Sequence, residues 1–277
     1  MPTDHHETPR GVLPRAPHRV MQVLGTLAIS PTGAPLSRLS QRLGAPKSSL
    51  LNLLRALEQA GYVECDDGLY RLGRASVQLG AMIIGGDPML RTVRHLLRRL
   101  ARECGETSMI GIIAQDDAHA LYVESVESRN ALSFAVPVGR PVPLYCTAIG
   151  RAYLAFQGER RIRAYLDRAA LIAYTPHTTV RKAELRRILS EVHAAGFAET
   201  SSQMHEGIDG FAAPVFDASG RVCAMVAAGA PAERVEGRRA ELRQRVREAG
   251  IEMSEVLGYR GPYPPRAPHG PAHGLTV

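Results

Sequence analysis

One run of sequence, PKSSLLNLLRALEQAG at positions 46–61, constrains the fold more strongly than any other part of the chain. Its leucines recur three and four positions apart, so they share one face of a predicted helix. Pro46 suits the first turn of such a helix, and Gly61 suits its end. The opposite face carries Lys47, Ser48, Ser49, Asn52 and Arg55. The pattern therefore predicts a helix that is buried on one side and polar on the other.

A second, shorter helix is predicted just before it, in PLSRLSQRLG at positions 35–44. Leu36, Leu39 and Leu43 share one side of this helix, and Gly44 supplies a tight turn after it. Two helices joined by a short turn with glycine, the second having a polar outer face, form the helix-turn-helix pattern.

The segment after the two helices favours a β-hairpin. Residues 62–72 read as two strands around the turn Asp66-Asp67-Gly68. With a first helix predicted at 17–29, these elements make a winged helix-turn-helix domain over residues 17–75, whose helix-turn-helix lies at about 35–60. A generic helix pair with a hairpin is the plainer alternative.

The run GAPKSSLLNLLRALEQAGYV, followed by DGLYRLG, resembles the DNA-binding domain of the IclR family of bacterial transcriptional regulators. Two later runs, VGRPVPLYCTAIGRAYLAF and EGIDGFAAPVFDASGRVCAMVAAGAP, resemble the same family's effector-binding domain, so that matching segments cover roughly residues 18–257. The resemblance implies a regulator, such as a repressor, that binds double-stranded DNA at a catabolic operon and responds to a small organic acid. It also implies a homodimer, or a tetramer, on a palindromic operator.

The polar face of the helix at 46–61 would then lie in the major groove. Ser48, Ser49 and Asn52 are able to reach base edges, and Leu51 would pack on a thymine methyl group. The residues expected to hold DNA phosphates are Lys47, Arg55, Arg38 and Arg42, with Arg71 from the wing, which is the hairpin predicted at 62–72.

Residues 76–104 are predicted to form two helices that link the domains. The resemblance implies that the first of them contributes to dimer contacts. The second carries a stripe of arginines, which are Arg91, Arg94, Arg98, Arg99 and Arg102. Two interpretations of this stripe stay open: a phosphate-binding surface, and a solvated helix face or dimer rim.

Residues 105–259 predict an α+β domain, an antiparallel sheet with flanking helices, which the resemblance makes a GAF-like effector-binding domain. Predicted strands lie at 108–114, 120–126, 132–138, 211–216 and 222–228, and one last helix runs from about 233 to 257. The composition of residues 1–16 and 260–277 predicts a disordered arm and a disordered tail.

A small-molecule pocket is expected in this second domain. A glycine-rich segment that leads into a helix at Thr147 leaves backbone N–H groups free to hold a carboxylate. The residues expected around the effector are Tyr145, Cys146, Thr147, Ala148, Gly150, Thr200, Gly210, Phe211, Val226 and Ala228.

The resemblance also exposes a difference. Family members that bind small polar acids place an acidic side chain, a cysteine and two serines around the pocket, where this chain has Thr200, Gly210, Val226 and Ala228. A polar two-carbon acid would find few partners there. A roomier, apolar pocket suits an aromatic or longer carboxylate, unless these residues are merely packed core.

Composition and motifs exclude several other classes of protein. The net charge of +7 suits a polyanionic partner such as DNA. The four cysteines have no CxxC spacing, which favours reduced thiols in a cytoplasmic protein. Such a protein would be associated with the nucleoid through its binding to DNA. No stretch reaches the ~18 apolar residues of a membrane span.

The sequence contains none of the GxSxG, HExxH, Walker A or GxGxxG motifs, and its histidines lack zinc-site spacing. We therefore expect no enzyme, no metal and no cofactor, although a catalytic cysteine stays open. Two alternatives to a ligand-responsive regulator also stay open. One is a DNA-binding protein without a ligand, and the other is a sensor or enzyme domain with a degenerate helix-turn-helix.

Overall fold

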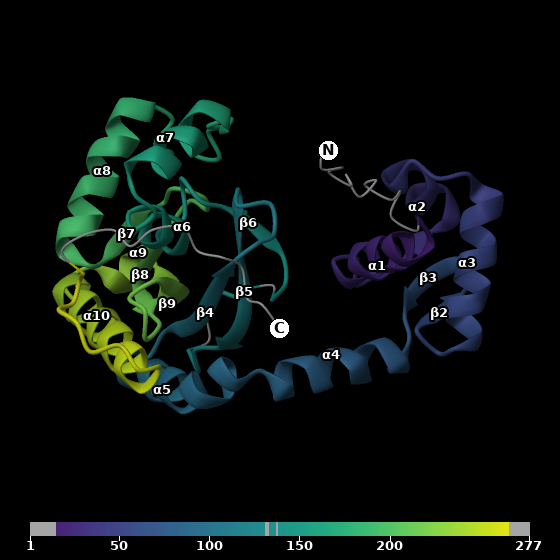
Figure 1. Ribbon diagram of the computed structural model, residues 1–277, viewed down its shortest axis with the longest axis horizontal. Coiled ribbons are helices and arrows are strands. Elements are labelled where there is room, and N and C mark those ends of the chain that lie inside the picture. Colours follow the sequence, from purple (N-terminus) through teal and green to yellow (C-terminus); the bar gives the residue numbers. More distant parts are fainter. Residues whose placement is uncertain (1–14, 131–132, 137, 266–277) are drawn as a thin grey trace, which may run out of the picture. The chain divides into compact units, whose positions relative to one another are not determined.

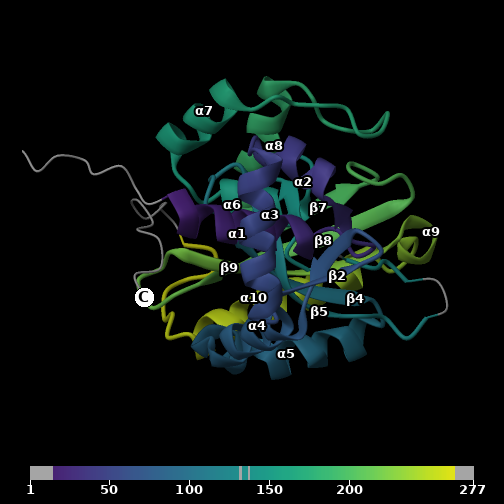
Figure 2. The same ribbon diagram turned by 90° about the vertical axis from the view of Figure 1, so that its right-hand side faces the viewer.

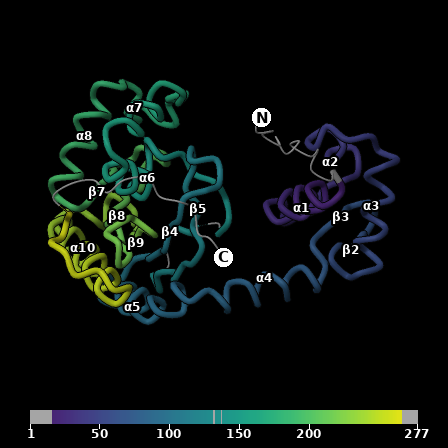
Figure 3. The backbone as a smooth tube through the Cα atoms, viewed as in Figure 1, coloured from purple at the N-terminus to yellow at the C-terminus, as the bar shows by residue number. Residues whose placement is uncertain are grey.

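The structure is a computed structural model of the 277-residue chain, and it describes residues 15–130, 133–136 and 138–265. The chain divides into two compact units, Met1–Gly86 and Asp87–Val277. Figure 1 labels their helices and strands, and Figure 3 traces the backbone through each unit. Among the described residues, the first unit has one apolar core and the second has two.

The first unit is the predicted winged helix-turn-helix domain. Its helices are α1 (Arg15–Ala28), α2 (Leu36–Leu43), α3 (Lys47–Gln59) and α4 (Arg74–Gly86). Its strands are β1 (Ala34–Pro35), β2 (Val63–Asp66) and β3 (Leu69–Leu72). They form an antiparallel sheet in the order β1-β3-β2, in which the short strand β1 is an element that the sequence analysis does not predict.

Leucines of α2 and α3 form the centre of this unit. Leu39, Leu50 and Leu54 are completely buried. Gly44 follows α2 with a φ of 56°, a left-handed conformation that glycine adopts without strain, and so turns the chain towards α3. The Ser40 hydroxyl donates a hydrogen bond across this turn to the carbonyl of Ala45 (2.7 Å). The apolar face thus fixes α3 while its polar face stays exposed.

Helix α4 is exposed along its length. Among its side chains none is buried, and Val77, Met82 and Ile83 are 65%, 60% and 64% exposed. Its first turn is held to the wing, because the Ser76 hydroxyl donates to the carbonyl of Tyr62 (2.7 Å). An apolar helix surface of this kind is typical of a protein contact.

The second unit is built on a six-stranded antiparallel sheet in the order β6-β5-β4-β9-β8-β7. The strands are β4 (Thr107–Ile113), β5 (His119–Val126), β6 (Pro141–Pro143), β7 (Ala198–Ser201), β8 (Ile208–Phe216) and β9 (Val222–Pro231). The helices are α5 (Pro88–Cys104), α6 (Ala148–Leu154), α7 (Glu159–Arg168), α8 (Lys182–Ala195), α9 (Ala232–Val235) and α10 (Arg239–Val256). This confirms the predicted α+β class.

Helices cover both faces of this sheet. Helices α6, α7 and α8 lie on one face, and α5 and α10 lie on the other (Figures 1 and 2). The side chains of successive β9 residues point to opposite faces of the sheet. Met225 and Ala227 therefore pack towards α6, while Val226 and Ala228 pack towards α5 and α10. The sheet therefore separates two apolar cores.

One predicted strand is wrong. Residues 133–136 form no strand, and residues 131, 132 and 137 lie outside the described part of the chain. The strand in this region is β6, which pairs with residues 119–121 of β5. The apolar alternation that suggests a strand at 132–138 has another cause, because Phe134 and Val136 line a cavity over the sheet.

The expected last helix is two helices. Gly237, with a φ of 79°, separates α9 from α10. The spacing of the apolar residues does not indicate this break, because it continues across the glycine.

The predicted disordered tail also begins too early. Tyr263 packs against the ring of Phe216 in the core, with ring centroids 5.4 Å apart, and its hydroxyl donates to the carbonyl of Pro214 (2.7 Å). Burial of this aromatic ring outweighs the polar, proline-rich composition of residues 260–265. The arm at 1–14 and the tail from 266 on lie outside the described residues.

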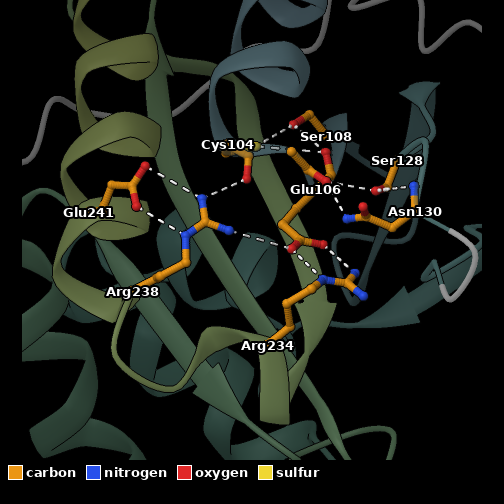
Figure 4. Close-up of polar contacts among 9 residues, drawn as sticks. Cys104, Glu106, Ser108, Ser128, Asn130, Arg234, Arg238 and Glu241 are labelled. Carbon is orange, nitrogen blue, oxygen red and sulfur yellow. Dashed lines mark hydrogen bonds and ion pairs between the residues drawn. The ribbon is translucent and has the colours of Figure 1, made fainter.

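A buried carboxylate holds the end of α5 to α9 and α10 (Figure 4). Glu106, 1% exposed, accepts two hydrogen bonds from the guanidinium of Arg234, each 2.6 Å long, and these bonds raise the pKa of Arg234. Arg238 donates to the carbonyl of Cys104 (3.0 Å) and pairs with Glu241. Because a buried charge is costly unless it is paired, this contact fixes where β4 begins.

Gly150 of α6 gives a test of this packing. A Cβ there would lie 2.2 Å from the backbone of Leu144, so we expect Gly150→Ala to lower the free energy of unfolding by about 1–3 kcal/mol. Gly80→Ala in α4 is the matched control, because its Cβ meets nothing and alanine favours a helix. Chemical denaturation followed by circular dichroism measures both. Equal stability of Gly150→Ala and the unsubstituted protein would contradict the packing.

Candidate nucleic-acid interface and ligand pocket

The polar face predicted for α3 is exposed in the structure. Lys47, Ser48, Ser49, Asn52 and Arg55 are all exposed. The fully buried leucines on the other side of α3 hold them in place. The arrangement presents hydroxyl, amide and cationic groups on one helix, which is the set of groups that reads base edges and binds phosphates.

Helix α2 adds two cations to this surface. Arg38 and Arg42 are exposed, and among the described residues neither forms an ion pair, nor does Lys47 or Arg55. Their charges are therefore available to a polyanion.

Two of the predicted contact residues differ from the expectation. Leu51 is half-buried rather than on the exposed side, so only part of its side chain is open to solvent. Arg71 is exposed, but it is already engaged within the first unit: it donates to the carbonyl of Thr32 in the turn after α1 (3.3 Å) and lies 3.6 Å from the Asp66 carboxylate of β2. Its charge is thus shared with a neighbouring acid.

A cavity of about 290 Å³ lies on the α6 face of the second unit. Its walls come from β4, β5, β7, β8, β9, the start of α6, residues 134–136, 140 and 142, and the loop between β7 and β8. Most of its lining side chains are apolar, including Met109, Tyr122, Phe134, Val142, Ile149, Met204 and Ile208. Such a chamber excludes water from an apolar ligand.

Two paired glycines form part of the cavity wall. Gly210 of β8 is the strand partner of Gly229 of β9. A Cβ on Gly210 would lie 2.9 Å from the Thr200 hydroxyl, and one on Gly229 would lie 2.7 Å from the ring of Phe134. The space exists because neither strand has a side chain at this point.

The structure brings seven of the ten predicted pocket residues to the cavity, and they are Cys146, Thr147, Ala148, Thr200, Gly210, Phe211 and Ala228. The side chains of Phe211 and Ala228 belong to the core on the opposite face, so these two border the cavity through their backbone.

The other three do not line the cavity. Placing Val226 there is wrong, since its side chain lies in the opposite core and Ala227 faces the cavity instead. The Tyr145 hydroxyl is bound to the backbone of Ile172 (2.6 and 2.9 Å), and Gly150 packs on Leu144.

Most polar groups of the lining are already satisfied. The Thr147 hydroxyl donates to the carbonyl of Pro143 (2.7 Å) and accepts from the N–H of Gly150 (3.2 Å), so one N–H of the α6 start is occupied by the protein itself. The buried Asp209 carboxylate pairs with Arg239 (2.5 Å) and accepts from Ser201 (2.7 Å).

Gln203 is held by three partners behind the cavity. Its Oε1 accepts from Arg151 and from the N–H of Thr179, both at 2.8 Å, and its Nε2 donates to the carbonyl of His177 (2.6 Å). Arg151 is itself buried, and burial lowers its pKa to about 10. Burial also raises the pKa of the Cys146 thiol to about 11, which makes this cysteine a poor nucleophile.

Three polar side chains of the lining remain available. Arg140, Thr200 and His205 make no side-chain hydrogen bond with any described residue, and Arg140 and His205 are exposed at the cavity. Sequence reasoning missed Arg140 and His205, because they lie on loops that only the fold brings to the cavity. No local signal distinguishes them from other surface residues.

Metal binding and membrane spanning find no support in the described part of the chain. No three His, Cys, Asp or Glu side chains gather there as a metal site would need. None of the described helices combines the length and the apolar character needed to cross a bilayer.

A winged helix-turn-helix unit joined in one chain to a second unit that encloses a cavity is the architecture of a DNA-binding regulator with a separate ligand-binding domain. Residues 16–67 match the model of the IclR helix-turn-helix domain, and residues 83–255 match that of the bacterial transcriptional regulator IclR C-terminal domain. The chain belongs to the IclR family of bacterial transcriptional regulators, which confirms the resemblance seen in the sequence.

Individual relatives agree with this assignment. The HTH-type transcriptional regulator XynR of Escherichia coli (strain K12) is 29% identical over 244 residues, which cover 87% of this chain and 96% of that protein. The crystal structure of an IclR transcriptional regulator from Alicyclobacillus acidocaldarius has a TM-score of 0.82 and 26% identity, and covers 89% of this chain and 100% of its own.

An IclR homolog from Microbacterium hydrocarbonoxydans, complexed with 4-hydroxybenzoate, shares the fold. Its TM-score is 0.75 at 22% identity, with 87% of this chain and 98% of that chain covered.

Substitutions on α3 should separate base contacts from phosphate contacts. Asn52→Ala should remove about 1–3 kcal/mol of discrimination at one base pair. Arg55→Ala should weaken binding to all sequences and lower the salt dependence. Fluorescence anisotropy on an operator and its single-base variants measures both. An equal loss on every sequence for Asn52→Ala would contradict its role in reading a base.

Proposed function

We propose that this chain is a ligand-responsive regulator of transcription whose effector is a small carboxylate with an apolar, aromatic body. The observation that carries the proposal is the apolar cavity with two glycines in its wall and, in its lining, the cation Arg140, which pairs with no acid among the described residues. Regulation by binding rather than by catalysis is the proposed activity. Its site of action is then the cytoplasm, where the operator of a catabolic operon lies.

The size and lining of the cavity favour an aromatic acid over a two-carbon acid. About 290 Å³ is close to the lower limit of small-molecule pockets, which suits a single ring with its substituents. A ring would contact Met109, Tyr122 and Phe134, whereas glyoxylate or pyruvate would leave these surfaces uncovered.

Arg140 is the group best suited to bind the acid. Its guanidinium always carries a charge and matches the two oxygens of a carboxylate. Asp209, the acid among the described lining residues, is already neutralised by Arg239, so Arg140 meets no opposing carboxylate in the part of the lining that the structure describes. Thr200 and His205 are free to bind a second polar group, such as a ring hydroxyl.

The proposed DNA contacts are the exposed residues of α2, α3 and the wing. They are Arg38, Arg42, Lys47, Ser48, Ser49, Asn52, Arg55 and Arg71, with a partial contact from Leu51. Because one small domain of this kind contacts few base pairs, two copies on a palindromic operator supply the affinity.

The exposed apolar face of α4 supports a homodimer. Leu79, Met82 and Ile83 lie three and four positions apart on one side of α4 and are 37%, 60% and 64% exposed, so they leave a surface that a second copy of the helix is able to cover. An effector then alters DNA binding only if it binds one state of the dimer more tightly than the other.

Ligand binding gives the first test, by isothermal titration calorimetry on the full chain. We expect 4-hydroxybenzoate to bind more tightly than glyoxylate or pyruvate. Arg140→Gln should weaken carboxylate binding about tenfold or more, because a hydrogen bond to a charged group contributes about 1.5–3 kcal/mol, and should leave 4-hydroxybenzamide unaffected.

Arg129→Gln is the matched control for this experiment, since Arg129 is exposed on the same segment but does not line the cavity. Tight binding of glyoxylate or pyruvate together with no binding of any hydroxybenzoate would contradict the proposed ligand class.

The dimer has its own test. The double substitution Met82→Glu and Ile83→Glu places charge on the apolar face of α4 and should shift the protein from dimer towards monomer, as measured by light scattering after gel filtration. Gln78→Glu, also exposed on α4, should leave the mass unchanged. An unchanged mass for the double variant would exclude α4 from the dimer interface.

A further inference from the structure

Helix α5 carries a straight line of basic side chains on its solvent side. Arg91, His95, Arg98 and Arg102 are exposed and are spaced by four, three and four residues. At 3.6 residues per turn they fall within an arc of about 60°, on the side opposite the buried residues of α5, and they span about 16 Å. We call these four residues the α5 stripe.

The other arginines of α5 have partners. Arg94 pairs with Glu124 of β5 (2.8 Å), and Arg99 pairs with Glu252 of α10 and Glu103. These side chains point sideways, towards the neighbouring elements, and they neutralise the acids around the helix.

The arginines of the α5 stripe form no ion pair with an acidic side chain among the described residues. Glu103 is shared between Arg99 and Arg245 of α10 (3.4 Å), so it is not available to Arg102. Among the described residues, Arg91, Arg98 and Arg102 form no ion pair. Three uncompensated guanidinium groups in one line are neither core nor part of the ligand pocket.

We propose that the α5 stripe is a second DNA-contact surface, which binds the phosphates of duplex DNA beside the operator. Duplex DNA carries a charge about every 1.7 Å along its axis, so a stripe about 16 Å long faces several phosphates. The guanidinium group matches the geometry of a phosphate. Contacts of this kind add affinity without reading sequence.

DNA is the occupant that the rest of the chain favours, and the inference rests on the DNA-binding function. The winged helix recruits a duplex, and only residues 73–87 of the chain lie between the last strand of the wing and the start of α5, so the stripe is tethered closely to the DNA-binding unit. A neutral protein surface would leave the three charges unopposed, whereas a polyanion releases counterions on binding them.

The test uses the full chain and a 40-base-pair duplex of arbitrary sequence, because phosphate contacts do not depend on sequence. The triple variant Arg91→Gln, Arg98→Gln, Arg102→Gln should bind this duplex at least tenfold more weakly in fluorescence anisotropy. The slope of log K against log salt should fall by about 0.9 for each arginine that contacts a phosphate.

A second triple variant controls for net charge. Arg160, Arg163 and Arg168 are exposed on α7, and their replacement by Gln removes the same three charges elsewhere on the unit. This variant should retain most of the affinity and the slope. An equal loss in both triple variants would overturn the inference, since the effect would then be one of total charge.

Two further outcomes separate the alternatives. Dissociation of the stripe variant into monomers at unchanged helical content would overturn the inference and make the stripe a rim between protein copies. Failure of the unsubstituted protein to bind any duplex would instead refute the DNA-binding function itself.

Discussion

The two-residue alternation of β8 and β9 is the constraint on which the second unit depends. Side chains at every other position, such as Phe211, Val226 and Ala228, build the core with α5 and α10. At the positions between them, Gly210 and Gly229 face α6 and leave the space that the cavity occupies. One pair of strands thus supplies both a packed core and a pocket wall. A shift of one residue in register would exchange the two faces and remove both.

Features that depend on local periodicity could be predicted from the sequence. The leucine spacing of α3 and the glycine after α2 define the helix-turn-helix, because burial of an apolar stripe needs only the helical repeat. The exposed positions of Asn52 and Arg55 follow from the same repeat. The α+β class of the second unit follows in the same way from its hairpins and amphipathic helices.

Features that depend on contacts between distant segments could not be predicted. Val226 was one residue away from the cavity-facing position, since a family resemblance carries no information on which face of a strand is covered. Phe134 lies over Gly229, and Tyr263 packs against Phe216, and in neither case does the local sequence indicate the distant partner. Arg140 reaches the cavity only because the chain folds back at β6, so its charge looked like any other surface charge.

The most direct measurement is DNA binding by the full chain to the promoter region beside its own gene, followed by fluorescence anisotropy at fixed salt with and without a series of aromatic and aliphatic carboxylates. A ligand-responsive regulator predicts tight, sequence-specific binding that one aromatic carboxylate changes by severalfold or more, through coupling of about 1–3 kcal/mol. Specific binding that no carboxylate alters would contradict the proposed role of the cavity, and absence of specific binding would contradict the proposed role of α3.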